Sequence, residues 1–191
     1  MFRTNAKGLV RTMRTREFGA TGLRTSVLGL GCSRLGSVLG ADLKSSEALV
    51  RLALDHGVTY FDTSDLYGQG DSERLLGRVI GARTDVTICT KVGKRHALAK
   101  RLLIPFKATL TALAAKGAGS ANVISQARAQ PVPTCFEPKY LEAALHASLR
   151  RLGVERLGGV MLHSPDAETL RCGDALETLA KFKTAGKAGF I

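Results

Sequence analysis

The sequence predicts an α/β protein in which repeated βα units surround a parallel sheet. From about residue 14, short β-rich apolar runs alternate with stretches of helical periodicity, as in such units. The length of 191 residues is enough for one domain core. At 45% hydrophobic and 23% charged residues, the composition is that of a globular protein and excludes a disordered or collagen-like chain.

The expected elements follow one another in a regular order. A small hairpin at 14–27 opens the fold, with its turn at Gly19-Ala20-Thr21-Gly22. Buried strands are predicted at 26–31, 58–62, 86–91 and 160–163, and Phe190-Ile191 hints at a fifth. The first predicted helix has an N-cap at Asp42, Ser45 or Ser46 and runs to about His56. Further helices are predicted over 72–80 before Gly81, from Pro138 to Leu152 before Gly153, and from Gly173 or Asp174 to near Gly186.

One connection breaks this rhythm. Residues 92–136 separate the third strand from its helix, where about two to six residues are typical. We expect an insertion or lid here, with a basic helix over about 97–116 and a Gly-rich stretch at 117–120. The predicted organisation is a basic N-terminal appendage at 1–13 and one α/β unit at 14–191 that carries the insertion.

The net charge of +12 is concentrated in two segments. Residues 1–16 hold five Lys or Arg, residues 86–136 hold eight, and neither segment holds an acidic residue. The remainder of the chain is therefore close to neutral. A basic character of this local kind does not by itself indicate a nucleic-acid-binding protein.

The cysteines and the apolar runs exclude further classes of protein. The four cysteines are far apart in the sequence, with no C-x-x-C pair and no histidine at ligand spacing, so neither a zinc site nor a disulfide framework is expected. No apolar run approaches the roughly 18 to 20 residues of a membrane span, and Met1–Met13 lacks the apolar core of a secretory signal. We expect a cytoplasmic protein.

Titratable residues end three successive predicted strands: Asp62 the second, Lys91 the third and His163 the fourth. Tyr67 follows Asp62 by five residues. Because parallel strands bring their carboxyl ends to one edge, we expect these four side chains around one pocket. Singly, each has an ordinary structural interpretation: a loop-capping Asp, a solvated Lys, a turn His and an uninformative Tyr. Their joint placement favours chemistry.

That chemistry is the reduction of a carbonyl group. A lysine ammonium beside a phenol favours the phenolate, which makes the phenol a useful proton donor, and a carboxylate keeps the lysine charged. A neutral imidazole can add a hydrogen bond to a carbonyl oxygen. Such a set suits a reaction in which a cofactor supplies hydride and an acid supplies a proton.

Several motifs resemble those of the aldo/keto reductase family. They are Gly29-Leu30-Gly31-Cys32, Phe61-Asp62-Thr63-Ser64-Asp65-Leu66-Tyr67-Gly68, Ser72-Glu73-Arg74-Leu75-Leu76-Gly77, Thr90-Lys91-Val92-Gly93 and Leu162-His163-Ser164. The resemblance implies a (β/α)8 TIM-barrel lineage and reduction of an aldehyde or ketone with NADPH. It implies a catalytic tetrad of Asp62, Tyr67, Lys91 and His163, in which Tyr67 is the general acid. It also implies that Gly31, Cys32, Ser33 and Asp62 lie at the nicotinamide side of the cofactor.

The length is short for such a barrel, which takes about 250 residues. By this resemblance the chain corresponds to about the first four βα units, a partial and C-terminally truncated barrel. We therefore expect weak cofactor binding and self-association through exposed strand edges. The alternative is a non-catalytic protein that contacts anionic partners through the basic insert, at Lys94-Arg95-His96, Lys100-Arg101 and Lys107. Specific readout of nucleic acid is not expected, because Phe106 is the only Phe, Tyr or Trp within residues 94–107, which hold these basic groups.

Overall fold

A parallel sheet of five strands forms the centre of the computed structural model, which describes residues 3–5, 8–10, 13–36, 42–81, 83–95 and 132–191. The strands are β5 (Gly29–Gly31), β6 (Tyr60–Asp62), β7 (Thr87–Val92), β8 (Leu157–Leu162) and β9 (Ala188–Phe190). Their order in the sheet is their order in the chain, and all four pairings are parallel. The predicted α/β class and partial (β/α)8 fold are confirmed.

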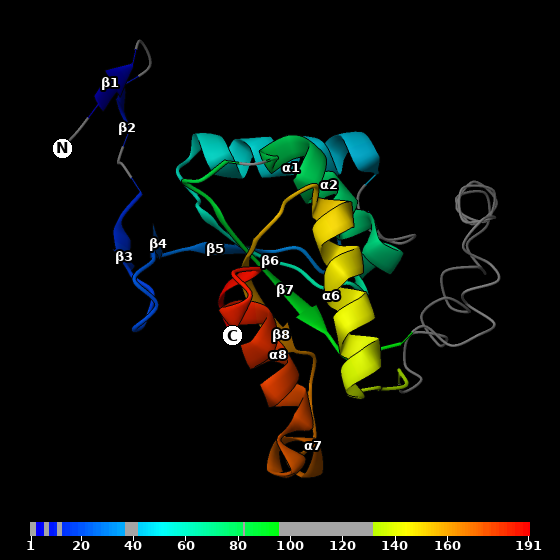
Figure 1. Ribbon diagram of the computed structural model, residues 1–191. Helices are drawn as coiled ribbons and strands as arrows, with labels where there is room; N and C mark the ends of the chain where they lie inside the picture. Colours follow the sequence, from blue (N-terminus) through cyan, green and yellow to red (C-terminus); the bar gives the residue numbers. More distant parts are fainter. Residues whose placement is uncertain (1–2, 6–7, 11–12, 37–41, 82, 96–131) are drawn as a thin grey trace, which may run out of the picture.

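Helices connect the strands and follow the sheet in chain order (Figure 1). They are α1 (Leu43–Asp55), α2 (Asp71–Ile80), α6 (Pro138–Leu152) and α8 (Asp174–Thr184). The short helix α7 (Ala167–Cys172) precedes α8, and the 3-10 helix η1 (Tyr67–Gly70) precedes α2. None of the described helices is long and apolar enough to cross a membrane.

Local sequence signals define most helix ends. The Asp42 side chain accepts a hydrogen bond from the Ser45 backbone N–H at 3.0 Å and so caps α1. Pro138 opens α6, where the missing N–H costs nothing, and Gly153 ends that helix in the left-handed conformation. These starts and stops agree with those predicted from the sequence.

Two hairpins precede the sheet. β1 (Arg3–Asn5) pairs with β2 (Gly8–Val10), and β3 (Thr15–Glu17) pairs with β4 (Arg24–Ser26), each as a separate antiparallel sheet. The hairpin expected at 14–27 is thus present. Ser26 belongs to β4 rather than to the first parallel strand, which begins only at Gly29.

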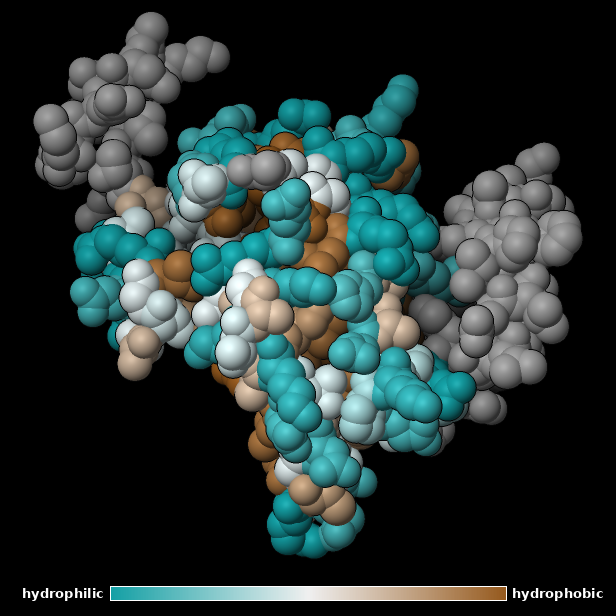
Figure 2. Space-filling view, viewed as in Figure 1, coloured by the Kyte–Doolittle hydropathy of each residue, from teal (hydrophilic) through white to brown (hydrophobic). Residues whose placement is uncertain are grey.

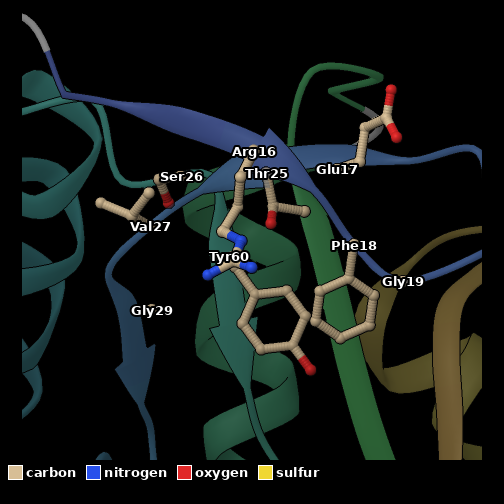
Figure 3. Close-up of a pocket in the computed structure, with 9 residues that line it drawn as sticks. All are labelled: Arg16, Glu17, Phe18, Gly19, Thr25, Ser26, Val27, Gly29 and Tyr60. Carbon is tan, nitrogen blue, oxygen red and sulfur yellow. The ribbon is translucent and has the colours of Figure 1, made fainter.

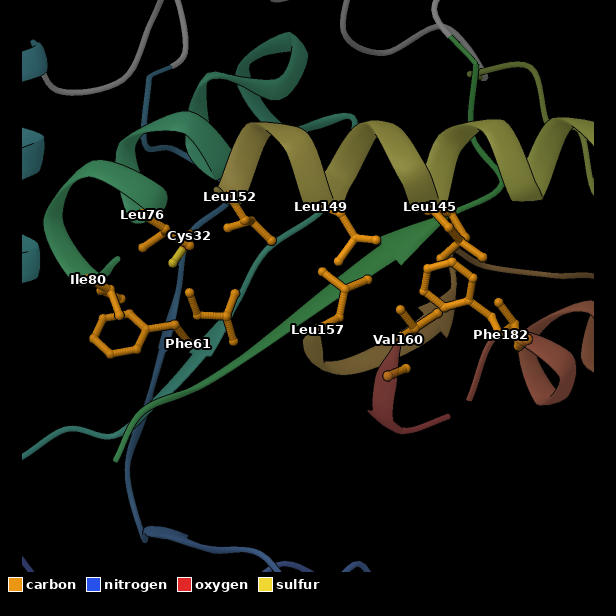
Figure 4. Close-up of a cluster of buried hydrophobic side chains, with 14 of the residues drawn as sticks. Cys32, Phe61, Leu76, Ile80, Leu145, Leu149, Leu152, Leu157, Val160 and Phe182 are labelled. Atoms are coloured by element: carbon orange, nitrogen blue, oxygen red, sulfur yellow. The ribbon is translucent and has the colours of Figure 1, made fainter. Parts of the chain in front are cut away.

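The hydrophobic core lies between the sheet and the helices. Leu145, Leu149 and Leu152 extend from α6 towards the strands and belong to one buried cluster with Phe61 and Val160 (Figure 4). Leu145 and Val160 are fully buried, as are Leu75 and Leu76 of α2. Helix α2 approaches α6 so closely that a Cβ at Gly77 would come within 2.5 Å of the Leu152 carbonyl oxygen. The close contact of these two helices therefore depends on glycine.

The ends of the expected insertion are held together just beyond β7. Lys94 and Thr134 form an isolated antiparallel β-bridge. The Arg95 N–H donates to the Pro133 carbonyl at 2.7 Å, and the Cys135 N–H donates to the Gly93 carbonyl at 2.8 Å. We call residues 93–95 and 133–135 the neck. The basic helix expected at 97–116, the Gly-rich stretch at 117–120, and His96, Lys100, Arg101, Phe106 and Lys107 lie outside the described residues.

The fourth parallel strand differs most from its prediction. It begins at Leu157 instead of Val160 and ends at Leu162, so that His163 comes directly after it. Gly158 and Gly159 make this strand weak in β propensity. Tertiary packing requires them: a Cβ at Gly159 would lie 2.0 Å from the Phe190 ring, and one at Gly158 would lie 2.8 Å from the Ile88 carbonyl oxygen.

Candidate active site

The register of the sheet brings the predicted residues to one edge. Gly31 of β5 is level with Asp62 of β6, and Lys91 lies near the end of β7. Beyond the strand ends, the Asp65 N–H donates to the Lys91 carbonyl at 3.1 Å, and the His163 N–H donates to the Val92 carbonyl at 2.8 Å. These backbone bonds hold the loops after β6 and β8 against the end of β7.

Asp62 and Lys91 form an ion pair across neighbouring strands. The Lys91 ammonium donates to Asp62 Oδ1, and it also donates to the Thr63 carbonyl at 3.1 Å. The Lys91 side chain is 15% exposed, whereas that of Asp62 is 38% exposed. The pair thus has one shielded and one open side, from which a small molecule can approach.

The Tyr67 ring lies next to the lysine of this pair. The Lys91 ammonium lies 5.3 Å from the centroid of the Tyr67 ring, within the range of a cation–π contact. The backbone turns sharply after Tyr67, because Gly68, Gln69 and Gly70 all have positive φ angles, of 59°, 63° and 88°. Gln69 adopts this conformation without being glycine, a local strain of the kind found at functional sites. The turn leads directly into α2.

His163 completes the group. Its ring meets the Tyr67 ring edge-on, with centroids 5.7 Å apart and planes at 85°. Ser164, the next residue, has a positive φ of 56° and turns the chain away from the sheet. Burial, together with the Lys94 and Lys91 ammonium groups, lowers the pKa of His163 to about 4. The imidazole is therefore neutral near pH 7 and able to donate a hydrogen bond from one nitrogen.

Ser64 makes a contact that the sequence did not indicate. Its hydroxyl lies 2.9 Å from Nδ1 of His163, although the two residues are 99 positions apart. Ser64 is fully buried, and its hydroxyl is also 3.2 Å from the Asp65 carboxyl. Burial and the Glu73 carboxylate raise the pKa of Asp65 to about 7, against the opposing effect of Arg151. The loop after β6 thus carries an acid, Asp65, whose pKa is raised close to neutrality.

The residues expected on the cofactor side divide into two kinds. Gly31 has open space in front of it, since a Cβ there would meet nothing within 4 Å, and Ser33 is exposed. In contrast, Cys32 is fully buried in the core, and burial raises the pKa of its thiol to about 12. Its N–H donates to the Asp62 carbonyl, and its carbonyl accepts from the Ser72 hydroxyl. Cys32 therefore fixes the position of the loop.

The backbone on this side of the site is open to a ligand. The open backbone at Gly31 is level with Asp62, so that a flat ring can approach the strand end without meeting a side chain there. The described residues hold no group of three or more His, Cys, Asp or Glu side chains suited to a metal ion. All four cysteines are free thiols.

The opposite end of the strands holds a cavity and a cluster of aromatic side chains. A cavity of about 320 Å³ lies between the β3–β4 hairpin and the beginnings of β5 and β6, where Phe18 and Tyr60 lie side by side (Figure 3). Their ring centroids are 5.0 Å apart, and Phe18 is also 5.0 Å from Phe190. This aromatic cluster contains none of the predicted site residues.

Comparison with known proteins shows the same architecture in longer chains. The model of the aldo/keto reductase family matches residues 27–191. L-galactose dehydrogenase from Arabidopsis thaliana is 42% identical over 84 residues, which are 41% of this chain and 26% of that protein. An aldo-keto reductase structure from Pseudomonas aeruginosa has 26% identity and a TM-score of 0.69, over 92% of this chain and 58% of its own. The holo form of an aldo-keto reductase from Bacillus halodurans has 25% identity and a TM-score of 0.70, over 93% and 48%.

Proposed function

Because this chain belongs to the aldo/keto reductase family, we propose that its site reduces an aldehyde or ketone to an alcohol with NADPH. The observation that carries the proposal is the meeting of Asp62, Lys91, Tyr67 and His163 at one edge of the sheet. The chain spans about a quarter of the length of the curated relative and about half that of the structural ones. The activity, the cofactor and the substrate class of this chain are therefore proposals that rest on the geometry of its own site.

NADPH would be held at its nicotinamide end by the backbone at Gly31 and Ser33, next to Asp62. When bound, it supplies the hydride that adds to the carbonyl carbon. The protein's own residues manage the proton. In the proposed roles, Tyr67 donates its hydroxyl proton to the carbonyl oxygen, and the Lys91 ammonium stabilises the negative charge left on the phenol oxygen. Asp62 keeps Lys91 charged through their ion pair.

His163 fits the role of orienting the carbonyl. Its low pKa keeps the ring neutral, so it can donate a hydrogen bond without adding a second cation beside Lys91. The edge-on contact with Tyr67 places both rings around the same space. In this role His163 fixes the carbonyl oxygen next to the proton donor.

The test is carbonyl-dependent oxidation of NADPH by the full chain, followed by the loss of nicotinamide absorbance with millimolar cofactor and a panel of aldehydes and ketones. Tyr67→Phe keeps the ring contact with His163 but removes the acidic proton. We expect it to lower kcat by about 100-fold or more. An unchanged rate in Tyr67→Phe, or no turnover by the wild-type chain, would contradict the proposal.

Self-association is a separate proposal about partners. Among the described strands β5 and β9 each have one neighbour, so each leaves one edge open. Leu28, next to β5, is 61% exposed. Hydrophobic residues also gather in a hollow between α1 and α8 (Figure 2). Sedimentation of the full chain tests the proposal: we expect dimers or larger species, and monomers at all concentrations would overturn it.

The alternative of an anion-binding insert receives less support from the structure. Within the described part of the insert, Lys94 and Arg95 belong to the neck, and the Arg95 guanidinium lies 5.4 Å from the centroid of the Tyr140 ring. The Lys94 carbonyl accepts a hydrogen bond from the Tyr140 hydroxyl at 2.9 Å. Through the Arg95 side chain and the Lys94 backbone, these contacts anchor the neck on α6.

A further inference from the structure

The Ser64 hydroxyl has one proton and three acceptors within reach. Nδ1 of His163 is 2.9 Å away, while the Lys91 carbonyl and the Asp65 carboxyl are both 3.2 Å away. The Leu66 N–H also donates to this hydroxyl, at 3.2 Å. Because Ser64 is fully buried, water does not relieve the competition for its proton. The direction in which the hydroxyl donates must therefore be decided by its protein neighbours.

That direction determines which nitrogen of His163 carries the ring proton. If Ser64 donates to Nδ1, the neutral ring carries its proton on Nε2, and that nitrogen is a donor. If Ser64 donates to Asp65 or to the Lys91 carbonyl, Nδ1 must instead donate to Ser64, and Nε2 becomes a bare acceptor. Only the first arrangement allows His163 to donate to a carbonyl oxygen from its side away from Ser64.

We propose that Ser64 is a positioning residue that holds His163 in its donor tautomer, and that protonated Asp65 is the state that selects this arrangement. The inference rests on the proposed function for its consequence in catalysis, but the tautomer itself is a property of the chain alone. Neither residue belongs to the tetrad, and each acts through His163.

The protonation state of Asp65 decides whether the Ser64 proton goes to Asp65 or to His163. As a carboxylate it is a charged acceptor 3.2 Å from Ser64 and attracts the hydroxyl proton away from His163. As a carboxylic acid it can donate to the Ser64 oxygen, which leaves the Ser64 proton for Nδ1. The pKa of Asp65 is raised to about 7, so that both forms are populated near neutrality.

The charged groups around this chain of hydrogen bonds come from four elements of the fold and from the neck. Glu73 of α2 favours protonation of Asp65, and Arg151 of α6 opposes it. On the imidazole side, Lys91 of β7 and Lys94 of the neck oppose a charge on His163, and Asp62 of β6 favours one. Because the lysines and burial together keep His163 neutral, its response to pH near 7 is a change of tautomer rather than of charge.

The direct test is the nitrogen NMR spectrum of the full chain labelled with 15N-histidine. The protonated and bare nitrogens of a neutral imidazole have widely separated shifts, and His163→Gln identifies which signals belong to His163 among the four histidines. We expect the Nε2–H tautomer at pH 6 and a growing fraction of the Nδ1–H tautomer as the pH rises through 7. An Nδ1–H tautomer at pH 6 would overturn the proposal.

Two variants separate the roles. Asp65→Asn keeps a donor beside Ser64 at every pH, so it should hold the Nε2–H tautomer throughout. Ser64→Ala should shift the tautomer ratio about tenfold away from Nε2–H, the effect of one buried hydrogen bond. Ser64→Thr retains the hydroxyl and should restore the wild-type ratio, and circular dichroism checks that each variant folds. A wild-type tautomer ratio with wild-type pH dependence in both Ser64→Ala and Asp65→Asn contradicts the proposal.

The catalytic consequence is measured separately. In the wild type, kcat/KM for a carbonyl should fall as the pH rises through 7, whereas in Asp65→Asn this fall should be absent. If the tautomers behave as expected but no variant turns over a carbonyl, the role of Ser64 stands and the proposed reduction fails. If carbonyl turnover occurs but does not follow the tautomer of His163, the proposed reduction stands and the catalytic role of Ser64 fails.

Discussion

Two ion pairs in this molecule have opposite surroundings. Glu73 of α2 is fully buried, and both of its oxygens are bonded, one to Arg151 of α6 at 2.5 Å and the other to Thr90 of β7 at 2.6 Å. Asp62 and Lys91 pair at the sheet edge, with Asp62 38% exposed. The closed pair ties two helices to the sheet, and the open pair leaves charge available to a ligand. The same interaction thus serves architecture in one place and, in the proposed function, chemistry in the other.

The largest effect on stability is expected at the closed pair. Glu73→Ala leaves the Arg151 guanidinium, 20% exposed, without its carboxylate and removes the partner of the Thr90 hydroxyl. Breaking a buried pair from one side costs about 3 to 5 kcal/mol of unfolding free energy. Urea denaturation measures it. The double variant Glu73→Met/Arg151→Met should recover much of the loss, and a double variant as unstable as Glu73→Ala would contradict this interpretation.

The open pair should respond in activity instead. Lys91→Met removes the ammonium beside Tyr67 and should lower kcat/KM for carbonyl reduction by about 100-fold. Its stability cost should be smaller than that of Glu73→Ala, because water reaches the Asp62 carboxylate. Steady-state rates and urea midpoints, measured on the same preparations, decide the point. A Lys91→Met chain that unfolds as readily as Glu73→Ala would show that the two pairs do not differ in kind.

Two titrating groups near the open pair should give stability opposite slopes with pH. His163, with its lowered pKa of about 4, binds fewer protons in the native state than when unfolded between pH 4 and 6.5, so its contribution rises with pH. Asp65, with its raised pKa of about 7, binds more protons in the native state between about pH 4 and 7, so its contribution falls.

The two contributions are separated by single substitutions. His163→Gln should leave a stability that falls from pH 4 to 6.5 relative to the wild type. Asp65→Asn should leave one that rises from pH 4 to 6.5. Thermal unfolding across this range measures both, and slopes of the same sign in the two variants would contradict the assignment.

An exposed pair provides the smallest expected effect. Glu177 and Lys181 pair at 2.7 Å along α8, with side chains 63% and 75% exposed. The neighbouring carboxylate raises the pKa of Lys181, but water and salt screen the interaction. Glu177→Ala should change neither the melting temperature nor the activity measurably. A melting temperature lowered as far as in Glu73→Ala would break the distinction between closed and exposed pairs.

The sequence was informative where signals are local. Helix α6 has its predicted bounds because Pro138 and Gly153 specify its ends through backbone chemistry alone. The meeting of Asp62, Lys91 and His163 followed from the rule that parallel strands share one edge. The start of β8 was mispredicted because Gly158 and Gly159 are required by packing against Ile88 and Phe190, which lie far away in the chain.

Ser64 shows where prediction from sequence stops. In the motif it is one small residue between Thr63 and Asp65, and its hydrogen bond to His163 spans 99 positions. Neither periodicity nor spacing predicts such a contact. Helix α7 was also missed, although Asp166 caps it by accepting from the Thr169 N–H at 2.8 Å. A cap followed by only six residues is too short a periodic signal.

Strand order that follows chain order has a consequence for synthesis on the ribosome. Each parallel strand from β6 onward finds its neighbour already made, so the sheet can grow as the chain emerges. The aromatic contact of Phe18 with Phe190 is the exception, because it joins the β3–β4 hairpin to β9, the strand farthest from β5 in the described sheet. We expect stalled chains that lack β9 to protect β6 and β7 from hydrogen exchange more strongly than the β3–β4 hairpin, which Tyr60 already contacts but Phe190 does not yet contact. Synthesis of Phe190 would then complete the packing of this hairpin against the sheet.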